Sequence, residues 1–320
     1  MRKYGIAIGI LVLVGLLPLF VSNYVLSVLT LGGIYVVLVL GLNMCLGFSG
    51  QISAAQAAFW GIGSYTSALL TTEFGISFWL AFPTAIILTG IVGLGLALPT
   101  LKLKGFYLAM ATIGFQQIAT MVFANWRQVT KGVDGIVGIP RPSIAGFTLK
   151  SDLSFSYFLL GWALIAILFS LRLEKSKLGL AMKALRDNSL AAETMGMDVN
   201  KIKIISFVLS AALGGAAGSL YAHYAGYISP DLFNFNTSTL IISMLIIGGS
   251  GSVAGSVVGA MLLIILPEAL RFMNNYYMVI YGLGTVLIVV FVPGGLAGLT
   301  SRIMNKLLTK RQISGGGAAK

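Results

Sequence analysis

The segment Tyr24-Val-Leu-Ser-Val-Leu-Thr-Leu-Gly-Gly-Ile-Tyr-Val-Val-Leu-Val-Leu-Gly-Leu-Asn-Met-Cys-Leu46 decides the fold class. It contains no Asp, Glu, Lys or Arg. An α-helix needs about 20 apolar residues to cross a hydrocarbon core of ~30 Å, and this segment is long enough. A helix also satisfies its own backbone hydrogen bonds in lipid, where water is absent. The segment therefore predicts a transmembrane helix.

The composition extends this prediction to the whole chain. Of 320 residues, 57% are hydrophobic and 9% are charged, and the mean hydropathy is +0.94. Globular proteins carry roughly 25% charged residues, so most of the charge that keeps a protein soluble is missing. We predict an all-α polytopic membrane protein with one transmembrane domain over residues 1–300 and a basic cytoplasmic tail over residues 301–320.

Ten apolar segments are candidate spans. The eighth and ninth, on either side of Gly248–Ser252, are short, so eight spans plus re-entrant segments remain an alternative. The candidates are the run that ends at Val21, then Tyr24–Leu46, Ala54–Leu70, Trp79–Leu98, Gly105–Ala124, Leu153–Leu171, Ile202–Tyr221, Thr237–Ile247, Val253–Leu266 and Met278–Val292.

Basic residues orient these spans, because cytoplasmic loops carry an excess of Lys and Arg. With ten spans, both termini and the loop 172–203 lie in the cytoplasm, and the loop 125–152 lies outside. The net charge of +12 would suggest nucleic acid for a soluble protein. In a membrane protein it indicates cytoplasmic loops and anionic lipid, so no nucleic-acid partner is expected. The outer loop nevertheless contains four basic residues, Arg127, Lys131, Arg141 and Lys150.

Several classes of chemistry are excluded or disfavoured. One Cys and one His cannot form a Cys/His zinc site or a disulfide, and we expect no cofactor. No Gly-Lys pair occurs, so the chain has no Walker-type phosphate-binding loop for ATP. The predicted spans hold no charged residue, whereas ion-coupled carriers usually keep one there. An intramembrane enzyme is disfavoured because no acid, base and nucleophile cluster within the spans.

The loop 172–203 contains two predicted short helices. The first, Leu178–Leu185, has a modest apolar face, and the second, Leu190–Met195, can be capped by Asp187, Asn188 or Ser189. Gly196 can supply the left-handed residue that ends the second helix. We expect Leu190, Ala191, Ala192 and Met195 to offer a small apolar surface to a partner. The alternative is a helix that lies on lipid headgroups.

A glycine-rich break, Gly47-Phe48-Ser49-Gly50, precedes the uncharged polar residues Gln51, Ser53 and Gln56. These side chains, with the free backbone groups of a broken helix, could line a pathway for a zwitterion without trapping it. The alternative is that they satisfy neighbouring backbone groups at the kink. The break has a weak echo in Gly248-Gly249-Ser250-Gly251. His223 lies among tyrosines, which predicts an interfacial aromatic belt, with a ligand role as the alternative.

Six motifs occur in order along the chain: Gly41-Leu42-Asn43, Gly47–Ser53, Gly138-Ile139-Pro140-Arg141-Pro142, Ala184-Leu185-Arg186-Asp187-Asn188, Tyr221–Tyr224 and Tyr227–Pro230. Together they resemble the LivM-type permeases of branched-chain amino acid ABC importers, over roughly residues 25 to 295. The segment Ala191–Gly196 is similar to the Glu-Ala-Ala-x-x-x-Gly loop of ABC importer permeases. The chain departs from the usual pattern at Gln56, where many relatives carry His, and at Ala191, where the loop motif has an acid.

The resemblance implies a transport subunit, not an enzyme, in the plasma (inner) membrane of a bacterium or archaeon. Its implied partners are a LivH-type permease, two cytoplasmic ATP-binding subunits and an extracytoplasmic solute-binding protein. The alternative is a channel or permease for another small neutral solute, such as urea or amides. The residues expected to couple the chain to the ATPases are Leu185, Arg186, Asp187, Asn188, Ala191, Ala192, Glu193 and Gly196.

Overall fold

The computed structural model describes residues 22–103, 105–144, 147–149 and 151–269, together with Gly282, Gly295, Leu296 and Gly298. The described chain is predominantly helical, with four two-residue strands that form two pairs, which confirms the all-α class. The apolar run that ends at Val21, the last candidate span and the basic tail lie outside the described residues, so the number of spans stays a prediction.

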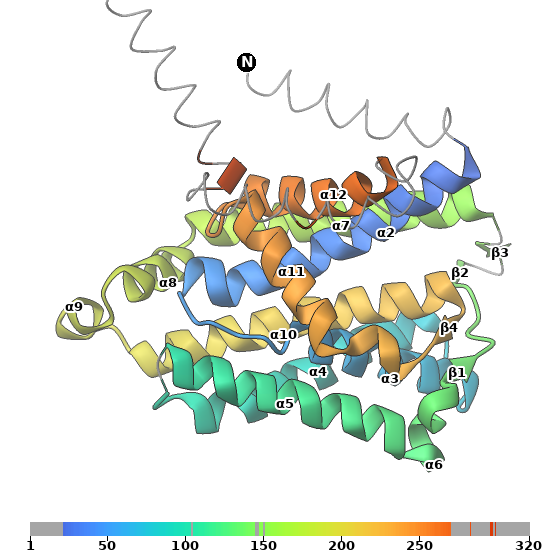
Figure 1. The fold of residues 1–320 in the computed structure, drawn as a ribbon, viewed down its shortest axis with the longest axis horizontal. Coiled ribbons are helices and arrows are strands. Elements are labelled where there is room, and N and C mark those ends of the chain that lie inside the picture. The colour runs from blue at the N-terminus through green and yellow to red at the C-terminus, as the bar shows by residue number, and fades with distance from the viewer. Residues whose placement is uncertain are drawn as a thin grey trace, which may run out of the picture.

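Five helices among the described residues are long and apolar enough to cross a membrane. Each coincides with a predicted span, and together they run along the long axis of the molecule (Figure 1). They are α2 (Asn23–Leu42), which continues as the π-helical turn η1 (Asn43–Phe48), α4 (Phe78–Thr100), α5 (Phe106–Asn125), α7 (Asp152–Lys175) and α10 (Val199–Ala225).

Three shorter helices adjoin breaks in the helical structure. They are α3 (Gln56–Thr72), α11 (Phe235–Gly248) and α12 (Val253–Ala269), of which α11 and α12 are strongly apolar. We call η1 and the irregular segment 49–55 before α3 the first break, and Gly249–Ser252, between α11 and α12, the second break. Gly50 in the first and Gly251 in the second have φ of +71° and +84°, which glycine adopts without steric cost. Both glycine-rich motifs therefore interrupt helices, as predicted.

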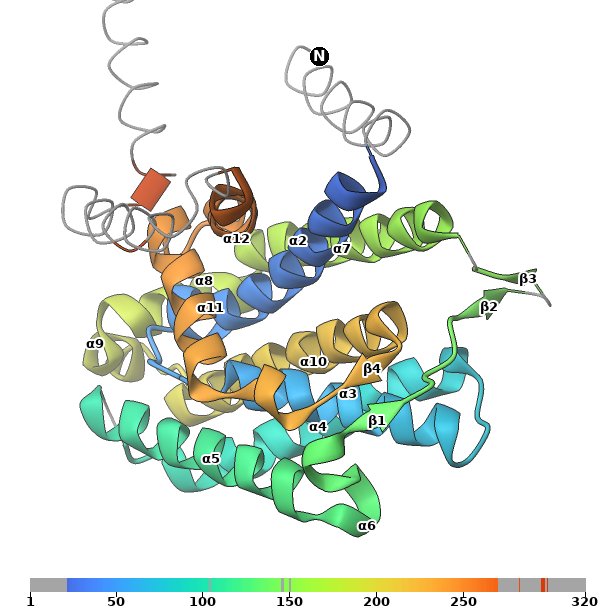
Figure 2. The ribbon, with the colours of Figure 1, turned by 45° about the vertical axis from the view of Figure 1, so that its right-hand side comes forward.

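The helices form two layers that α11 crosses (Figure 2). One layer holds α2, α7 and α12, and the other holds α3, α4, α5 and α10. The helix α10 packs closely on α3 because glycines face each other: Gly63 lies against Gly215, and Gly218 lies against the backbone of Trp60 and Ser64. Such small residues let helix backbones approach closely inside a bilayer.

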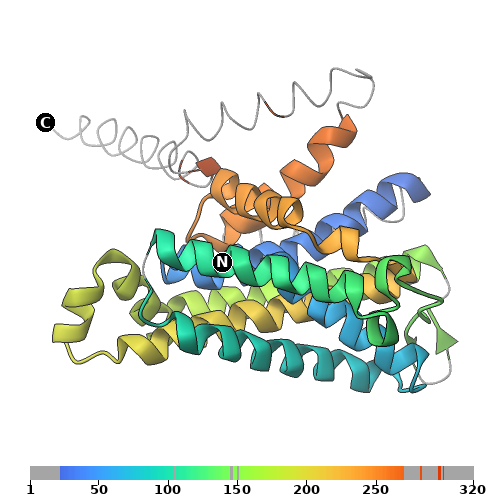
Figure 3. The same cartoon turned by 60° about the horizontal axis from the view of Figure 1, so that its bottom comes forward.

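Loops gather at two opposite ends of the bundle (Figures 1 and 3). One end carries α8 (Lys177–Asp187) and α9 (Ser189–Thr194). The predicted orientation requires the loops 172–203 and 125–152 to lie at opposite ends of the bundle. The other end carries α6 (Arg127–Thr130), η2 (Gly132–Asp134), β1 (Ile136–Val137), β2 (Ser143–Ile144), β3 (Phe147–Thr148), β4 (Tyr227–Ile228) and η3 (Pro230–Phe233).

Short antiparallel pairings fasten the second end. The strand β1 pairs with β4, with Ile136 opposite Ile228, and β2 pairs with β3. Two of the four basic residues in the loop 125–152 form ion pairs. Lys131 Nζ lies 2.7 Å from Glu73 Oε1, and Arg141 pairs with Asp152 at 2.6 Å. Neutralised by carboxylates, these two cations add little positive charge to the loop that is predicted to lie outside.

Candidate functional site

Gln51 lies in the first break and ties it to α10. Its side chain is 7% exposed, and its Nε2 donates to Ser206 Oγ at 2.6 Å and to Ser49 Oγ at 2.8 Å. Ser49 Oγ in turn donates to the carbonyl of Cys45 at 2.6 Å. The uncharged polar groups that follow the glycine-rich motif thus hold the break against the start of α10.

Gln56 and Ser53 are also buried. Gln56 Nε2 donates to the carbonyl of Leu38 in α2 at 3.1 Å, while its Oε1 accepts from Ser210 Oγ in α10 at 3.0 Å. Ser53 Oγ accepts from the amide of Ala55 at 3.3 Å. In this conformation the predicted pathway residues cross-link helices and satisfy backbone groups.

Side chains from neighbouring helices accept hydrogen bonds from the free backbone amides at and just before the start of α3. Ala54 N donates to Thr112 Oγ1 at 3.0 Å, Ala57 N to Ser238 Oγ at 3.0 Å, and Ala58 N to Gln116 Oε1 at 2.7 Å. No motif in the sequence predicted these three acceptors. Each of the three is an uncharged polar side chain inside a predicted apolar segment. Because such a group needs a hydrogen-bond partner where water is absent, this pattern could have marked all three in the sequence.

The predicted coupling loop forms the two expected short helices. Of the three candidate caps, Asn188 caps α9: its Oδ1 accepts from the amides of Leu190 and Ala191, both at 3.1 Å. Gly196 follows α9 with a φ of +80°. In α8, Met182 and Leu185 are buried, which confirms the amphipathic face.

The apolar surface of α9 is smaller than expected. Leu190 and Met195 are 70% and 80% exposed, but Ala192 is only 4% exposed. The expectation that Ala192 belongs to the exposed surface is wrong, because the loop folds back from α9 into α10 and covers it: the amide of Met197 donates to the carbonyl of Ala192 at 3.1 Å.

The loop 172–203, which is predicted to couple the chain to the ATPases, meets the first break directly. Arg186 Nη1 donates to the carbonyl of Gly47 at 2.8 Å. A cavity of about 170 Å³ lies beside this contact, with Gln51, Arg186 and Lys203 among its lining residues. The structure therefore brings together two groups of residues that lie far apart in the sequence, the predicted pathway residues and the predicted coupling residues.

His223 does not belong to an interfacial belt. It is fully buried, with Nδ1 2.6 Å from the carbonyl of Pro140 and Nε2 2.9 Å from Ser67 Oγ. Because a carbonyl only accepts, Nδ1 carries the proton toward Pro140, and in a neutral ring Nε2 accepts from Ser67. The aromatic-belt prediction is wrong for this residue, because partners from α3 and from the loop after β1 satisfy both ring nitrogens.

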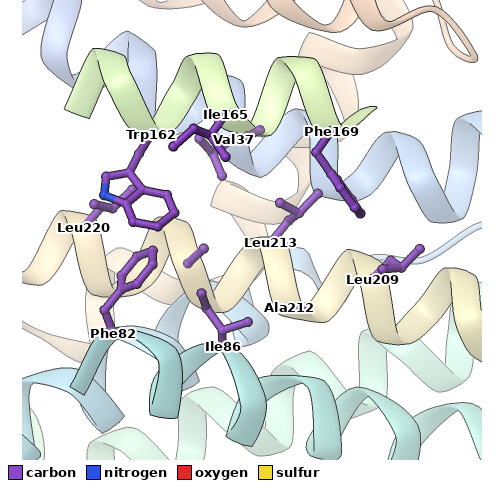
Figure 4. Close-up of a pocket in the computed structure, with 12 residues that line it drawn as sticks. Val37, Phe82, Ile86, Trp162, Ile165, Phe169, Leu209, Ala212, Leu213 and Leu220 are labelled. Atoms are coloured by element: carbon purple, nitrogen blue, oxygen red, sulfur yellow. The ribbon is translucent and has the colours of Figure 1, made fainter. Parts of the chain in front are cut away.

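An apolar crevice of about 250 Å³ lies between α4, α7 and α10 (Figure 4). Phe82, Trp162, Phe169 and Leu213 are among its lining side chains, and none of the lining residues is charged. The lining side chains are almost all apolar, so the carboxylate and ammonium of a zwitterion would find almost no hydrogen-bonding side chain there. The crevice is therefore a poorer candidate for the solute pathway than the first break. Among the described residues no group of His, Cys, Asp or Glu is arranged to hold a metal ion.

A family model described as the branched-chain amino acid transport system / permease component matches residues 24–291. The chain belongs to this permease family. It is 35% identical over 316 residues to the high-affinity branched-chain amino acid transport system permease protein LivM of Escherichia coli K12, an alignment that covers 92% of this chain and 74% of that one.

Other relatives of the permease have similar descriptions. The LivM protein of Salmonella typhimurium is 34% identical over 306 residues, which cover 88% of this chain and 72% of the relative. A probable branched-chain amino acid transport permease protein LivH of Methanocaldococcus jannaschii is 27% identical over 303 residues, with 86% and 91% covered. No solved structure matches the chain significantly. The permease is thus a multi-pass membrane transport subunit, and its relatives are not enzymes.

Proposed function

We propose that this permease forms the translocation pathway of an ATP-driven, binding-protein-dependent importer of branched-chain or other neutral amino acids in the plasma (inner) membrane of a bacterium or archaeon. The observation that carries the proposal is the family match over residues 24–291, joined by 35% identity to a LivM protein along most of the chain. The uncharged spans fit a solute that is neutral overall, because a fixed charge in the membrane would hold one end of a zwitterion.

The permease would pair with a LivH-type permease, two cytoplasmic ATP-binding subunits and an extracytoplasmic binding protein. Two observations support this assembly. The sequence has no Walker-type loop, so ATP hydrolysis must come from another chain. The relatives include LivM and LivH proteins, which points to two related permeases in one transporter.

The ATPase contact would lie on α8 and α9. Leu190 and Met195 expose apolar side chains at the tip of this loop, and their neighbours Asp187, Asn188, Ala191, Glu193 and Gly196 are exposed as well. Leu185 and Ala192 are buried and would brace the loop from inside. A short helix is marginal alone in water, so packing and the Asn188 cap must hold it ready for a partner.

The solute would cross beside the first break, past Gln51, Ser53 and Gln56. These residues are buried in the conformation described, so passage requires the contacts to Ser206 and Ser210 to open. A charged side chain in their place would add a bond of about 1.5–3 kcal/mol and slow release roughly ten- to a hundredfold. The uncharged amide and hydroxyl groups of these residues would bind the solute more weakly and release it faster.

Affinity purification of the permease from membranes tests the assembly. We expect a second permease and two ATP-binding subunits to copurify in stoichiometric amounts. A chain that purifies alone and conducts urea or an amide in liposomes without ATP would instead support the channel alternative.

A further inference from the structure

The two helix breaks touch each other, although they are far apart in the sequence. Asn43 Oδ1 in η1 accepts a hydrogen bond from the amide of Gly251 at 2.9 Å, across 208 positions. A Cβ atom added to Gly47 would come within 2.6 Å of the same amide, so the backbones are in close contact. The two similar glycine-rich motifs, Gly47–Gly50 and Gly248–Gly251, are therefore in direct contact with each other.

Arg186 reaches both breaks from the end of α8. Its Nη1 donates to the carbonyl of Gly47 at 2.8 Å. A Cβ atom on Gly50 would lie 2.8 Å from Arg186 Cγ, and one on Gly251 would lie 2.5 Å from Arg186 Nη1. The arginine side chain fills the space that side chains at these two glycines would need, so it packs on the first break and on the second.

A second cation on α8 strengthens the link to the first break. Lys183, one turn before Arg186, lies 5.5 Å from the centre of the Phe48 ring and pairs with Glu174 in α7 at 3.0 Å. Arg186 Nε also faces Asp187 Oδ1 at 3.3 Å. The planar guanidinium can address a carbonyl and a carboxylate at once, which the single ammonium of a lysine does less well.

We infer that Arg186 is a positioning residue that transmits movement of the coupling loop to both helix breaks. This inference rests on the proposed function, in which α8 and α9 move with the ATPases. Because Arg186 is bonded to the first break and packed against the second, a shift of α8 would displace the backbone on two sides of the pathway together. Without the guanidinium, α8 would keep the Lys183 contact with the first break but lose its contact with the second, which could then stay in place while α8 moves.

The functional test compares Arg186→Gln, Arg186→Lys and Arg172→Gln in the complete transporter reconstituted in proteoliposomes. Arg172 is an exposed arginine at the same end of the bundle and serves as the control. In Arg186→Gln we expect uptake per ATP hydrolysed to fall roughly tenfold, the factor for one lost charge-assisted hydrogen bond. Arg186→Lys should restore part of it, and Arg172→Gln should change nothing. An unaltered ratio in Arg186→Gln would overturn the inference.

A distance measurement separates transmission from simple support of the fold. Spin labels on Leu180→Cys in α8 and on Ser250→Cys in the second break are each measured against Phe74→Cys at the far end; all three sites are exposed and the native Cys45 is buried. On binding of an ATP analogue, both distances should shift in the otherwise unaltered complex, whereas with Arg186→Gln only the Leu180 distance should.

Two results would contradict this account in different ways. A Ser250 distance that still shifts with Arg186→Gln would overturn the role of Arg186 and leave the coupling loop in place. A Leu180 distance that is constant in the unaltered complex would overturn the coupling assignment of the proposed function, and the inference with it.

Discussion

Gln116 in α5 holds the start of α3 in place. Its Oε1 accepts from Ala58 N and from Ser238 Oγ, and its Nε2 donates to the carbonyl of Phe233 at 2.7 Å. In Gln116→Ala the amide of Ala58 loses its partner inside the protein, so we expect a loss of about 1–3 kcal/mol in unfolding free energy. Denaturant titration in mixed micelles measures it. Gln117→Ala, exposed on the same helix, should stay within about 0.5 kcal/mol, and equal losses would contradict the account.

Gly218 marks the closest approach of α10 to α3. A Cβ atom there would overlap the carbonyl of Trp60 and lie 2.6 Å from the amide of Ser64, so Gly218→Ala should cost about 1–3 kcal/mol by overpacking. Gly161 in α7 has open space around it, and Gly161→Ala should gain about 0.5–1 kcal/mol from helix propensity. The thermal unfolding temperatures of the two variants should therefore move in opposite directions, and a shift of the same sign in both would be evidence against this packing.

At the scale of elements, α9 depends on the residue that ends it. Gly196 has open space around a would-be Cβ, so only its φ of +80° resists substitution. Gly196→Val should cost about 1–3 kcal/mol locally and lower substrate-stimulated ATPase activity in the assembled transporter, while the bundle stays folded. Gly196→Asn should retain activity, because Asn tolerates the left-handed region. Unchanged ATPase activity in Gly196→Val would refute the role of this helix end.

The sequence predicted the elements whose causes are local. Apolar segments located the five long helices, glycines located both breaks, and Asn188 was among the predicted caps of α9. What it did not predict depends on distant neighbours. The β1–β4 pair is two residues long on each side and has no periodicity to recognise. The burial of Ala192 follows from the return of the chain from α9 into α10, and the burial of His223 from its partners in α3 and in the loop after β1.

At the scale of the whole molecule, the pathway is expected to select little by itself. Gln51→Ala, Ser53→Ala and Gln56→Ala, made singly, should lower uptake of several neutral amino acids by similar factors when the binding protein is unchanged. The physical reason is that none of the three side chains carries a charge, so selectivity would rest mainly with the delivering protein. Rates are divided by the amount of assembled transporter, because Gln56 also links α2 to α10. A switch in substrate preference would show that this permease itself selects.

Leucine uptake into proteoliposomes tests whether the permease transports only as part of an ATP-driven assembly. The permease is reconstituted alone, and together with its companion permease, the ATP-binding subunits and the binding protein. The account predicts no uptake by the permease alone and ATP-dependent accumulation of leucine against its gradient by the complete assembly. Leucine, or urea, that equilibrates through the isolated permease without ATP would contradict it.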